Sequence, residues 1–253
     1  MTRLPRYVRR TMNTTQIIHQ WRRALACLAL FAAFGTALAT QAGQLLWQIG
    51  EPDSNNTEFA LAPDQFRQFE QDGFFIVGES DPKRDWPYVH PGPEDGWAGA
   101  REHTFAILFG LQKPPGPGEC RLQLRLLDTH SGSPPKLRVL VNGQAFDRAL
   151  PRGAGDASIQ GSPATGKAQT LTIGFPATLL RTGDNTINIT LLSGSWILYD
   201  WVGLETPSGA ERQPAQARTV VERIQAIPAV VEAKGELLQP VRITLRHFGS
   251  DSA

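Results

Sequence analysis

The chain has 253 residues, of which 41% are hydrophobic, and its 25 basic and 24 acidic side chains give a formal net charge of +1. Six of the basic residues are arginines within residues 1–42, which hold no acid, so residues 43–253 carry 19 basic and 24 acidic side chains, a net charge of −5. Nucleic acids and anionic membrane surfaces attract basic clusters, so this balance argues against both as partners.

Residues 1–42 have the three-part layout of a secretory signal peptide. Arg22 and Arg23 precede an apolar run over Ala24–Ala39, and two small-residue cleavage motifs follow within residues 37–42. The run is shorter than the roughly 20 apolar residues of a membrane span, so a retained anchor is the less favoured alternative. We therefore expect a secreted or periplasmic protein without membrane contact after cleavage.

Cysteine usage agrees with a bacterial periplasm. Cys27 lies inside the expected signal peptide, which leaves Cys120 without an intramolecular disulfide partner. Small extracellular modules usually depend on disulfides, whereas a chain of this length can bury a hydrophobic core without cross-links.

The segment from residue 43 to residue 206 predicts an all-β fold. Apolar and polar residues alternate in short runs, and Asn142-Gly143 is a strong signal for a tight turn between two strands. No helical pattern separates the runs, which favours antiparallel strands in a sandwich or jelly roll. The predicted strands are His103–Phe109, Cys120–Leu126, Lys136–Val141, Thr170–Phe175, Asn185–Leu191 and Ile197–Leu204.

Three connections between these strands differ in character. Lys113–Glu119 is rich in proline and glycine and predicts a rigid turn. Pro151–Ala168 is rich in glycine, alanine and serine, and we expect a mobile surface excursion. Asp81–Arg101 is long and carries four aromatic or histidine residues among prolines and acids. Long ordered loops of this kind are often functional, so the candidate site is expected there.

The last part of the chain predicts a second unit. The stretch 207–217 is polar, contains two prolines and reads as a linker. Residues 218–253 combine a helix-like spacing near their start with a clear strand alternation in VRITLRHF. We favour the start of a second, incomplete β domain.

Five short blocks in the first unit resemble a known family. Their order and spacing are similar to the carbohydrate-binding-like domain, domain III, of the rhamnogalacturonan lyases of polysaccharide lyase family 4, from about residue 45 to residue 206. The matching residues are Trp47-Gln48-Ile49-Gly50 with Asp53 and Glu58-Phe59, Val77-Gly78-Glu79-Ser80, Asp85-Trp86, Gly183-Asp184-Asn185-Thr186-Ile187, and Tyr199-Asp200-Trp201-Val202-Gly203-Leu204-Glu205.

The resemblance implies a galactose-binding-like jelly-roll β-sandwich followed by a short, truncated β segment. Similar modules stand at the front of large secreted glycosidases, including proteins that resemble α-mannosidases. In the lyases the catalytic domain precedes this module, and here only the expected signal peptide does. We therefore expect a secreted, non-catalytic module that holds a polysaccharide or oligosaccharide, or orients a partner catalytic domain on it.

Two other functional hypotheses stay open. In the first, the chain is an amino-terminal piece of a polysaccharide lyase or glycoside hydrolase. In the second, it is a packing domain without a sugar site. The sequence contains no complete set of catalytic residues, so it gives no positive support to an enzyme. Glu94 and Asp95 are adjacent on a loop, whereas a glycosidase pair must face each other about 5–10 Å apart.

Aromatic residues in the long loop are the first candidates for carbohydrate contact. Trp86, Tyr88 and Trp97 offer apolar ring faces to sugar C–H groups. The alternative is that Trp86 and Trp97 close one end of the sandwich, because large aromatic side chains are usually buried. Neighbouring polar groups are candidates for hydroxyl contacts: Arg84, Asp85, His90 and Arg101. The remaining tryptophans of the first unit divide into Trp47 and Trp201, expected in the core, and Trp196, left open.

Two carboxylates stand within apolar strand sequence. Glu58 and Asp200 must be paired or coordinated if they are buried. Related jelly-roll modules sometimes carry a structural calcium ion, which makes these residues possible metal ligands. Calcium requires about six to eight oxygen ligands, however, so hydrogen bonds to the backbone or to an arginine are the favoured alternative, and no other cofactor is expected.

Overall fold

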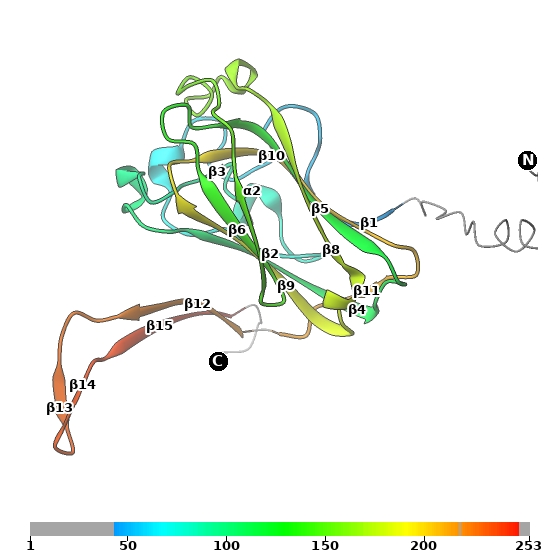
Figure 1. Cartoon of the computed structure of the whole chain (residues 1–253). Coiled ribbons are helices and arrows are strands. Elements are labelled where there is room, and N and C mark those ends of the chain that lie inside the picture. Colours follow the sequence, from blue (N-terminus) through cyan, green and yellow to red (C-terminus); the bar gives the residue numbers. More distant parts are fainter. Residues whose placement is uncertain (1–42, 218, 248–253) are drawn as a thin grey trace, which may run out of the picture. The chain divides into compact units, whose positions relative to one another are not determined.

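The computed structural model describes residues 43–217 and 219–247, and the expected signal peptide lies outside them. Figure 1 shows two sheets packed face to face, which confirms the all-β jelly-roll sandwich. One sheet has the order β1-β10-β5-β8 with β3 paired to β10, and the other has the order β11-β4-β9-β6-β7 with β2 paired to β4. All of these pairs are antiparallel except β2 with β4.

The two sheets of the sandwich have five and six strands. The first sheet contains β1 (Gln44–Gly50), β3 (Val89–His90), β5 (Glu119–Thr129), β8 (Gln169–Pro176) and β10 (Ile197–Thr206). The second contains β2 (Phe74–Ile76), β4 (Thr104–Lys113), β6 (Lys136–Val141), β7 (Gln144–Ala149), β9 (Gly183–Ser193) and β11 (Glu211–Gln213). Short helices are α2 (Pro82–Asp85), η1 (Phe66–Gln68), η2 (Gly96–Ala98), η3 (Pro163–Thr165) and η4 (Ala177–Leu179).

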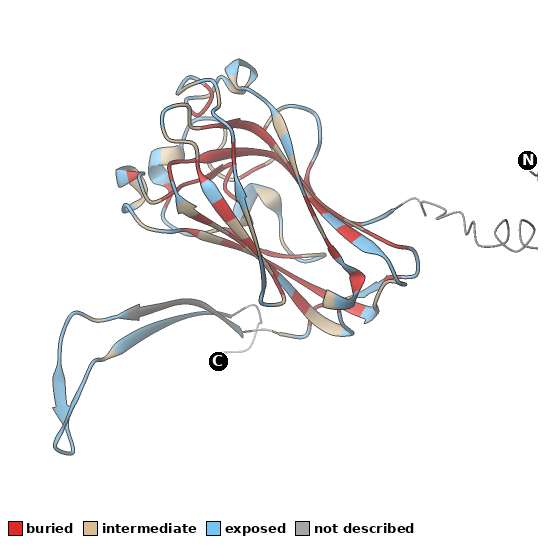
Figure 2. Cartoon of the chain, in the orientation of Figure 1, coloured by how far each residue is buried: buried red, intermediate tan, exposed pale blue. Residues whose placement is uncertain are grey.

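The alternation that predicts the strands also places the core. Cys120, Leu122 and Leu124 on β5 are fully buried, whereas Arg121 between them is exposed. Side chains on one strand point to opposite faces in turn, so each such run delivers one apolar row to the space between the sheets. All six predicted strands are present, and Figure 2 shows the buried residues concentrated between the two sheets.

The predicted tight turn is confirmed. Asn142 and Gly143 connect β6 to β7 with φ values of 47° and 90°. Both values lie in the left-handed region, which asparagine and glycine tolerate best and which a two-residue hairpin turn of this hand requires.

Residues 151–168 are anchored to the sandwich, which corrects the expected mobile excursion. The carboxylate of Asp128 is fully buried and accepts hydrogen bonds from the backbone N–H groups of Ala154 (2.9 Å) and Lys167 (3.1 Å) and from the hydroxyl of Ser158 (2.7 Å). Ile159 is buried as well. Composition indicates a flexible loop, but it does not reveal a carboxylate on another strand that ties the loop down.

We expect Asp128→Ala to release this loop. The substitution leaves several buried donors without an acceptor, and each costs about 1–3 kcal/mol. Amide hydrogen exchange should accelerate over residues 152–167 while the sheets remain protected, and the unfolding free energy should fall. Asp128→Asn keeps one carbonyl acceptor and should have the smaller effect. Unchanged exchange in Asp128→Ala would show that other contacts hold the loop.

The stretch 207–217, which the sequence predicts to be a linker, is attached to the sandwich. Its strand β11 pairs with β4. Asp184 at the start of β9 accepts hydrogen bonds from the backbone N–H groups of Gln216 (2.8 Å) and Ala217 (2.7 Å). Ala215 is buried against Phe74, among others.

Residues 219–247 form a two-stranded ribbon, hereafter the ribbon. Strand β12 (Thr219–Ala226) pairs with β15 (Val241–His247), and β13 (Val231–Ala233) pairs with β14 (Glu236–Leu238) near the tip. The ribbon confirms the strand that the alternation in VRITLRHF predicts, and a strand, not a helix, covers the residues with the helix-like spacing. No helix of the described residues is long and apolar enough to cross a membrane.

Candidate functional site

Three residues predicted to contact a ligand belong to the core. The side chains of Trp86, Tyr88 and His90 are 0% exposed. Trp86 packs edge-on against Phe105 with ring centroids 5.1 Å apart, and lies 5.4 Å from the ring of Tyr199. A ring without exposed surface offers no face to a sugar, so the prediction that these three residues contact a ligand is wrong. Trp86 instead packs in the core, as the alternative interpretation predicts.

His90 uses both of its ring nitrogens inside the protein. Nδ1 is hydrogen-bonded with the hydroxyl of Tyr199, and Nε2 with the backbone oxygen of His103, both at 2.9 Å. The ring stacks on Phe105 with centroids 3.9 Å apart. Burial lowers the pKa of His90 to about 3, because the charged imidazolium would lose its hydration. The ring is therefore neutral at physiological pH.

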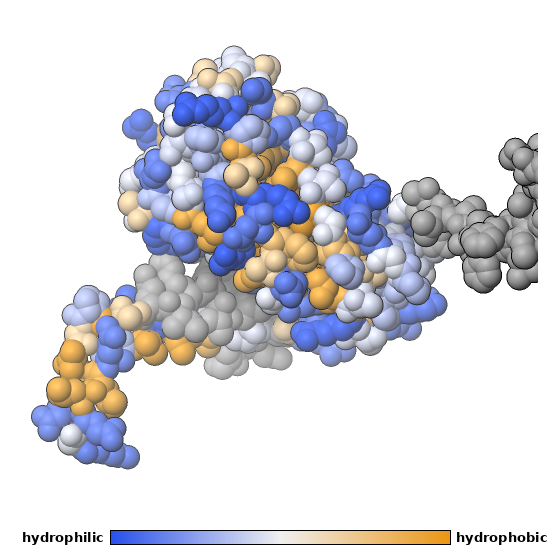
Figure 3. Space-filling model, in the orientation of Figure 1, coloured by the Kyte–Doolittle hydropathy of each residue, from blue (hydrophilic) through white to orange (hydrophobic). Residues whose placement is uncertain are grey.

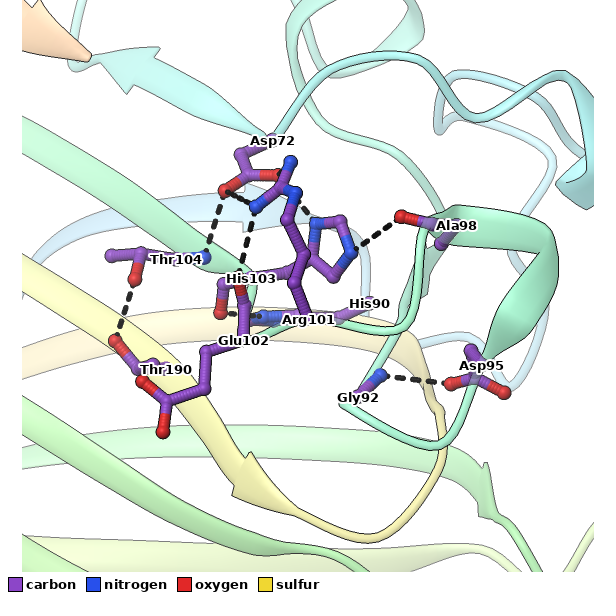
Figure 4. A network of polar contacts seen from close by, with 10 residues as sticks. All are labelled: Asp72, His90, Gly92, Asp95, Ala98, Arg101, Glu102, His103, Thr104 and Thr190. Carbon is purple, nitrogen blue, oxygen red and sulfur yellow. Dashed lines mark hydrogen bonds and ion pairs between the residues drawn. The ribbon is translucent and has the colours of Figure 1, made fainter. Parts of the chain in front are cut away.

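Arg101 belongs to a polar network at the loop end of the sandwich (Figure 4). Its Nη2 donates to Oδ1 of Asp72 at 3.1 Å, and Nδ1 of His103 lies 2.6 Å from the same oxygen. The backbone N–H of Thr104 donates to Oδ2 at 2.9 Å. Burial alone would raise the pKa of the Asp72 carboxyl, but the hydrogen bonds from His103 and Thr104 outweigh it and hold this pKa well below its usual range. Arg101 is 30% exposed, so its role as a polar contact stays a prediction.

Trp97 is the predicted aromatic residue that keeps part of its surface exposed. It lies on η2, and its Nε1 donates to Oδ1 of Asp95 at 3.2 Å. The buried Asp95 also accepts from the backbone of Gly92 (2.8 Å) and the hydroxyl of Ser195 (2.5 Å), which joins the loop to the turn before β10. Trp97 is thereby held in one orientation.

A hollow of about 470 Å³, hereafter the loop-end hollow, is lined by Phe66, which packs against this tryptophan, and Trp97 itself does not line it. Phe66 is half-buried within it and meets the ring of Trp97 edge-on, with centroids 5.1 Å apart. The guanidinium carbon of Arg67 lies 5.5 Å from the centre of the Phe66 ring. The other lining residues are exposed and polar: Asp64, Gln65, Gln68 and Gln160.

Tyr88 holds one wall of this hollow in place from within the core. Its hydroxyl donates to the backbone oxygen of Ile159 at 2.6 Å, immediately before Gln160. Burial raises the pKa of Tyr88 well above its usual value, with the nearby Asp64 charge adding to the effect, so the hydroxyl stays protonated and can donate. Tyr88 therefore fixes the segment that carries Gln160 without itself lining the hollow.

Asp85 and Arg84 lie on α2, and neither lines the loop-end hollow. The two side chains form an ion pair at 2.7 Å, and Oδ2 of Asp85 also accepts the backbone N–H of Asp81 at 2.9 Å. These bonds lower the pKa of Asp85 against the opposing effect of burial. The carboxylate closes its own helical turn, and a ligand contact at Asp85 stays a prediction.

Glu58 and Asp200 both have partners within the protein, and a calcium site at these residues stays a prediction. Oδ1 of Asp200 accepts the backbone N–H of Ser54 at 2.8 Å, and Oδ2 lies 3.3 Å from Nε of Arg125. Oε1 of Glu58 accepts the backbone N–H of Glu51 at 2.9 Å. The described residues contain no cluster of three or more acidic, histidine or cysteine side chains suited to a metal ion. The structure therefore has the backbone hydrogen bonds of the favoured alternative, and an arginine forms an ion pair with Asp200.

The other three tryptophans of the described residues are buried. Trp47 and Trp201 are buried as predicted, and Trp196, which the sequence leaves open, is buried as well. Trp196 packs edge-on against His130 with centroids 5.5 Å apart.

Sequence reasoning missed the residues that line the loop-end hollow. Phe66 and its polar neighbours lie in QFRQF, outside the long loop and the family blocks. The only signal for them in the sequence is an aromatic residue among two amides and an arginine, which combines an apolar ring face with hydrogen-bonding groups. Gln160 is about 90 residues away in the sequence, so only the fold brings it to the same hollow.

Comparison with known families identifies the module. The model of the CBM-like domain, domain III of polysaccharide lyase family 4, matches residues 45–204, and the chain belongs to this family. No curated protein matches the chain.

Several solved structures are similar over part of the chain. A family 35 carbohydrate-binding module from an environmental isolate shares 16% identity at a TM-score of 0.30, covering 46% of this chain and 72% of that module. CBM35 from Cellvibrio japonicus Abf62 shares 14% identity at 0.30, covering 46% and 71%. The cycloalternan-forming enzyme from Listeria monocytogenes shares 15% identity at 0.29, covering 46% of this chain and 9% of the enzyme.

Proposed function

We propose that this domain is a non-catalytic module that binds a polysaccharide at the loop-end hollow. The observation that carries the proposal is the composition of the hollow. Three amides, one carboxylate and one guanidinium surround the half-exposed ring of Phe66, with Trp97 behind it. An aromatic face matches the C–H surface of a sugar ring, while amide and charged groups exchange hydrogen bonds with its hydroxyls.

The way the hollow is built supports the same function. Tyr88 fixes the segment that carries Gln160, and Asp95 fixes the loop that carries Trp97. A surface that is already ordered loses less conformational entropy when a ligand binds. The hollow is shallow and formed mostly by exposed side chains, so we expect weak affinity for a single site and a preference for polymers that occupy several sites at once.

The family and the sequence together support the setting of this activity. We propose that residues 1–42 direct export to the periplasm or the exterior, where polysaccharides are met. The family is defined on a domain of polysaccharide lyases. We therefore propose that the module works beside a carbohydrate-active enzyme and holds that enzyme on its substrate.

Phe66→Ala should abolish or strongly weaken binding. Loss of the ring face should lower affinity at least about tenfold, equivalent to about 1.4 kcal/mol, while the fold remains intact because Phe66 is only half-buried. The measurement is affinity electrophoresis in gels that contain pectic, mannan or host polysaccharides, followed by calorimetry with matching oligosaccharides. Phe146→Ala is the matched control, because Phe146 is also half-buried but lies on β7 outside the hollow. Equal affinity in both variants would place the site elsewhere, and no binding to any polysaccharide would favour a packing domain.

A further inference from the structure

Large exposed apolar side chains are confined to two places in the described part of the chain. Seven of the eight lie on the ribbon, where Figure 3 shows apolar surface gathered. These seven are Val230, Val231, Leu237, Leu238, Val241, Ile243 and Leu245. The eighth is Leu45 on β1, which is 47% exposed. Contiguous exposed apolar surface on a soluble protein usually marks an interaction site.

Leu45 borders a groove on one side of the sandwich, hereafter the edge groove. It consists of two hollows of about 490 and 290 Å³ that share Val77, Gly78 and Arg212 in their walls. The larger hollow follows β1 over most of its length, and its apolar wall includes the buried Trp47. The groove is therefore elongated and follows the direction of a strand.

The edge groove lies between the edges of the two sheets of the sandwich. Strand β1 ends its sheet and pairs only with β10. On the other side, β2 and β11 follow one another along the outer edge of β4. Edge strands present unpaired backbone N–H and C=O groups and accept an added strand readily.

Strand β15 of the ribbon has the properties of such an added strand. It has seven residues, as does β1, and pairs only with β12 in the described part of the chain. Val241, Ile243 and Leu245 alternate with Arg242 and Thr244 along it. A two-stranded ribbon is marginally stable by itself, so a third strand would stabilise it and cover its apolar residues.

Charge in the edge groove matches this strand. The walls of the groove carry three acidic residues, Glu51, Glu58 and Glu79, and one basic residue, Arg212. Strand β15 contains two arginines and no acidic residue, so its net charge is opposite to that of the groove.

The connection to the ribbon leads away from the groove of the same molecule. From β11 at the groove, the chain continues to Gln216 and Ala217, whose backbone N–H groups are fixed by Asp184 on β9. In the sheet order β11-β4-β9, β9 lies on the far side of β4 from the groove. A second copy of the chain can supply the strand without displacing these contacts.

We propose that β15 of one molecule adds to β1 of a second copy and buries Val241, Ile243 and Leu245 against Leu45 and the edge groove. The exchange is reciprocal in a twofold dimer, so each molecule both donates a ribbon and accepts one. This surface is separate from the loop-end hollow, and its failure would leave the proposed carbohydrate binding untouched.

Sedimentation velocity and light scattering of the purified chain test the proposal. The unmodified chain should be a dimer, and both Leu45→Arg and Ile243→Arg should be monomers with unchanged circular dichroism, since both positions are exposed. An equimolar mixture of the two variants should regain dimers, because the intact ribbon of one variant fits the intact groove of the other. Val230→Arg is the matched control: Val230 is exposed on the ribbon but outside β15, so the dimer should persist.

Three results would overturn this assignment. A monomeric unmodified chain at all accessible concentrations would exclude the exchange. A dimer that survives Leu45→Arg but not Ile243→Arg would show that two ribbons pack on each other. One of the two reciprocal contacts is intact in a mixed pair, so failure of the mixed variants to form dimers at any accessible concentration would show that the ribbon and the edge groove do not contact one another.

Discussion

Trp86→Ala is expected to destabilise the domain by about 3–5 kcal/mol, the cost typical of removing a large buried aromatic side chain. Trp86 is fully buried and in ring contact with Phe75, Phe105 and Tyr199. Its replacement leaves a cavity between the sheets that these rings cannot fill. Chemical denaturation should show the midpoint shifted far down, and a sizeable unfolded population is expected near physiological temperature.

Two further variants separate packing from binding. Trp86→Phe keeps most of the ring and removes an indole N–H that has no hydrogen-bond partner in the core, so it should cost much less than Trp86→Ala. Trp97→Ala removes a partly exposed ring and should lower carbohydrate affinity more than stability. A stable Trp86→Ala protein that fails to bind sugar would contradict the assignment of Trp86 to the core.

Stability should decrease as the pH falls below about 6.5, chiefly because of His90. The folded pKa of His90 is about 3, whereas an unfolded histidine titrates near 6.5, so between these values the unfolded state binds more protons. Stability is therefore full above about pH 6.5 and decreases toward pH 3, by up to about 1.4 kcal/mol per pH unit. Asp72 acts in the same direction at lower pH, because its depressed pKa adds stability that is lost as the carboxylate is protonated.

Denaturation curves between pH 4 and pH 8 measure this effect. His90→Gln removes the titrating ring, so its stability should be lower at pH 8 but should change little from pH 6.5 to pH 4.5. Asp72→Asn retains His90 and should keep the slope in that range. A flat profile for the unmodified chain would show that His90 has an ordinary pKa in the folded state, contrary to its burial beside Phe105 and Tyr199.

The sheets could be predicted because their signal is local. On β5, the alternation from Cys120 to Leu126 identifies both the strand and its buried face, and Asn142-Gly143 identifies the turn that follows β6. The anchoring of residues 151–168 could not be predicted, since it depends on Asp128 from a strand more than 20 residues earlier. The same applies to the attachment of Gln216 to Asp184.

The sequence predicts a site in the loop 81–101, and the structure places several of the predicted side chains in the core. The loop 81–101 contains aromatic residues, yet composition does not tell which of them point inward. Trp86 and Tyr88 enter the core next to β3, and Trp97 stays at the surface on η2. Tyr88 still contributes to the hollow, because its hydroxyl donates a hydrogen bond to the backbone oxygen of Ile159, next to Gln160. The hollow itself needs η1 and the β7–β8 connection to meet, which depends on the tertiary fold.

Hydrogen exchange of the chain with and without a bound polysaccharide tests the central claim most directly. The polysaccharide is the one that gives the strongest retardation in affinity electrophoresis. We predict slower exchange in two separate segments, residues 64–69 and 158–161, together with the loop around Trp97, and no change in the edge groove or in the ribbon. Protection confined to the groove along β1, or protection absent from both hollow segments while the polysaccharide is bound, would contradict the loop-end hollow as the carbohydrate site.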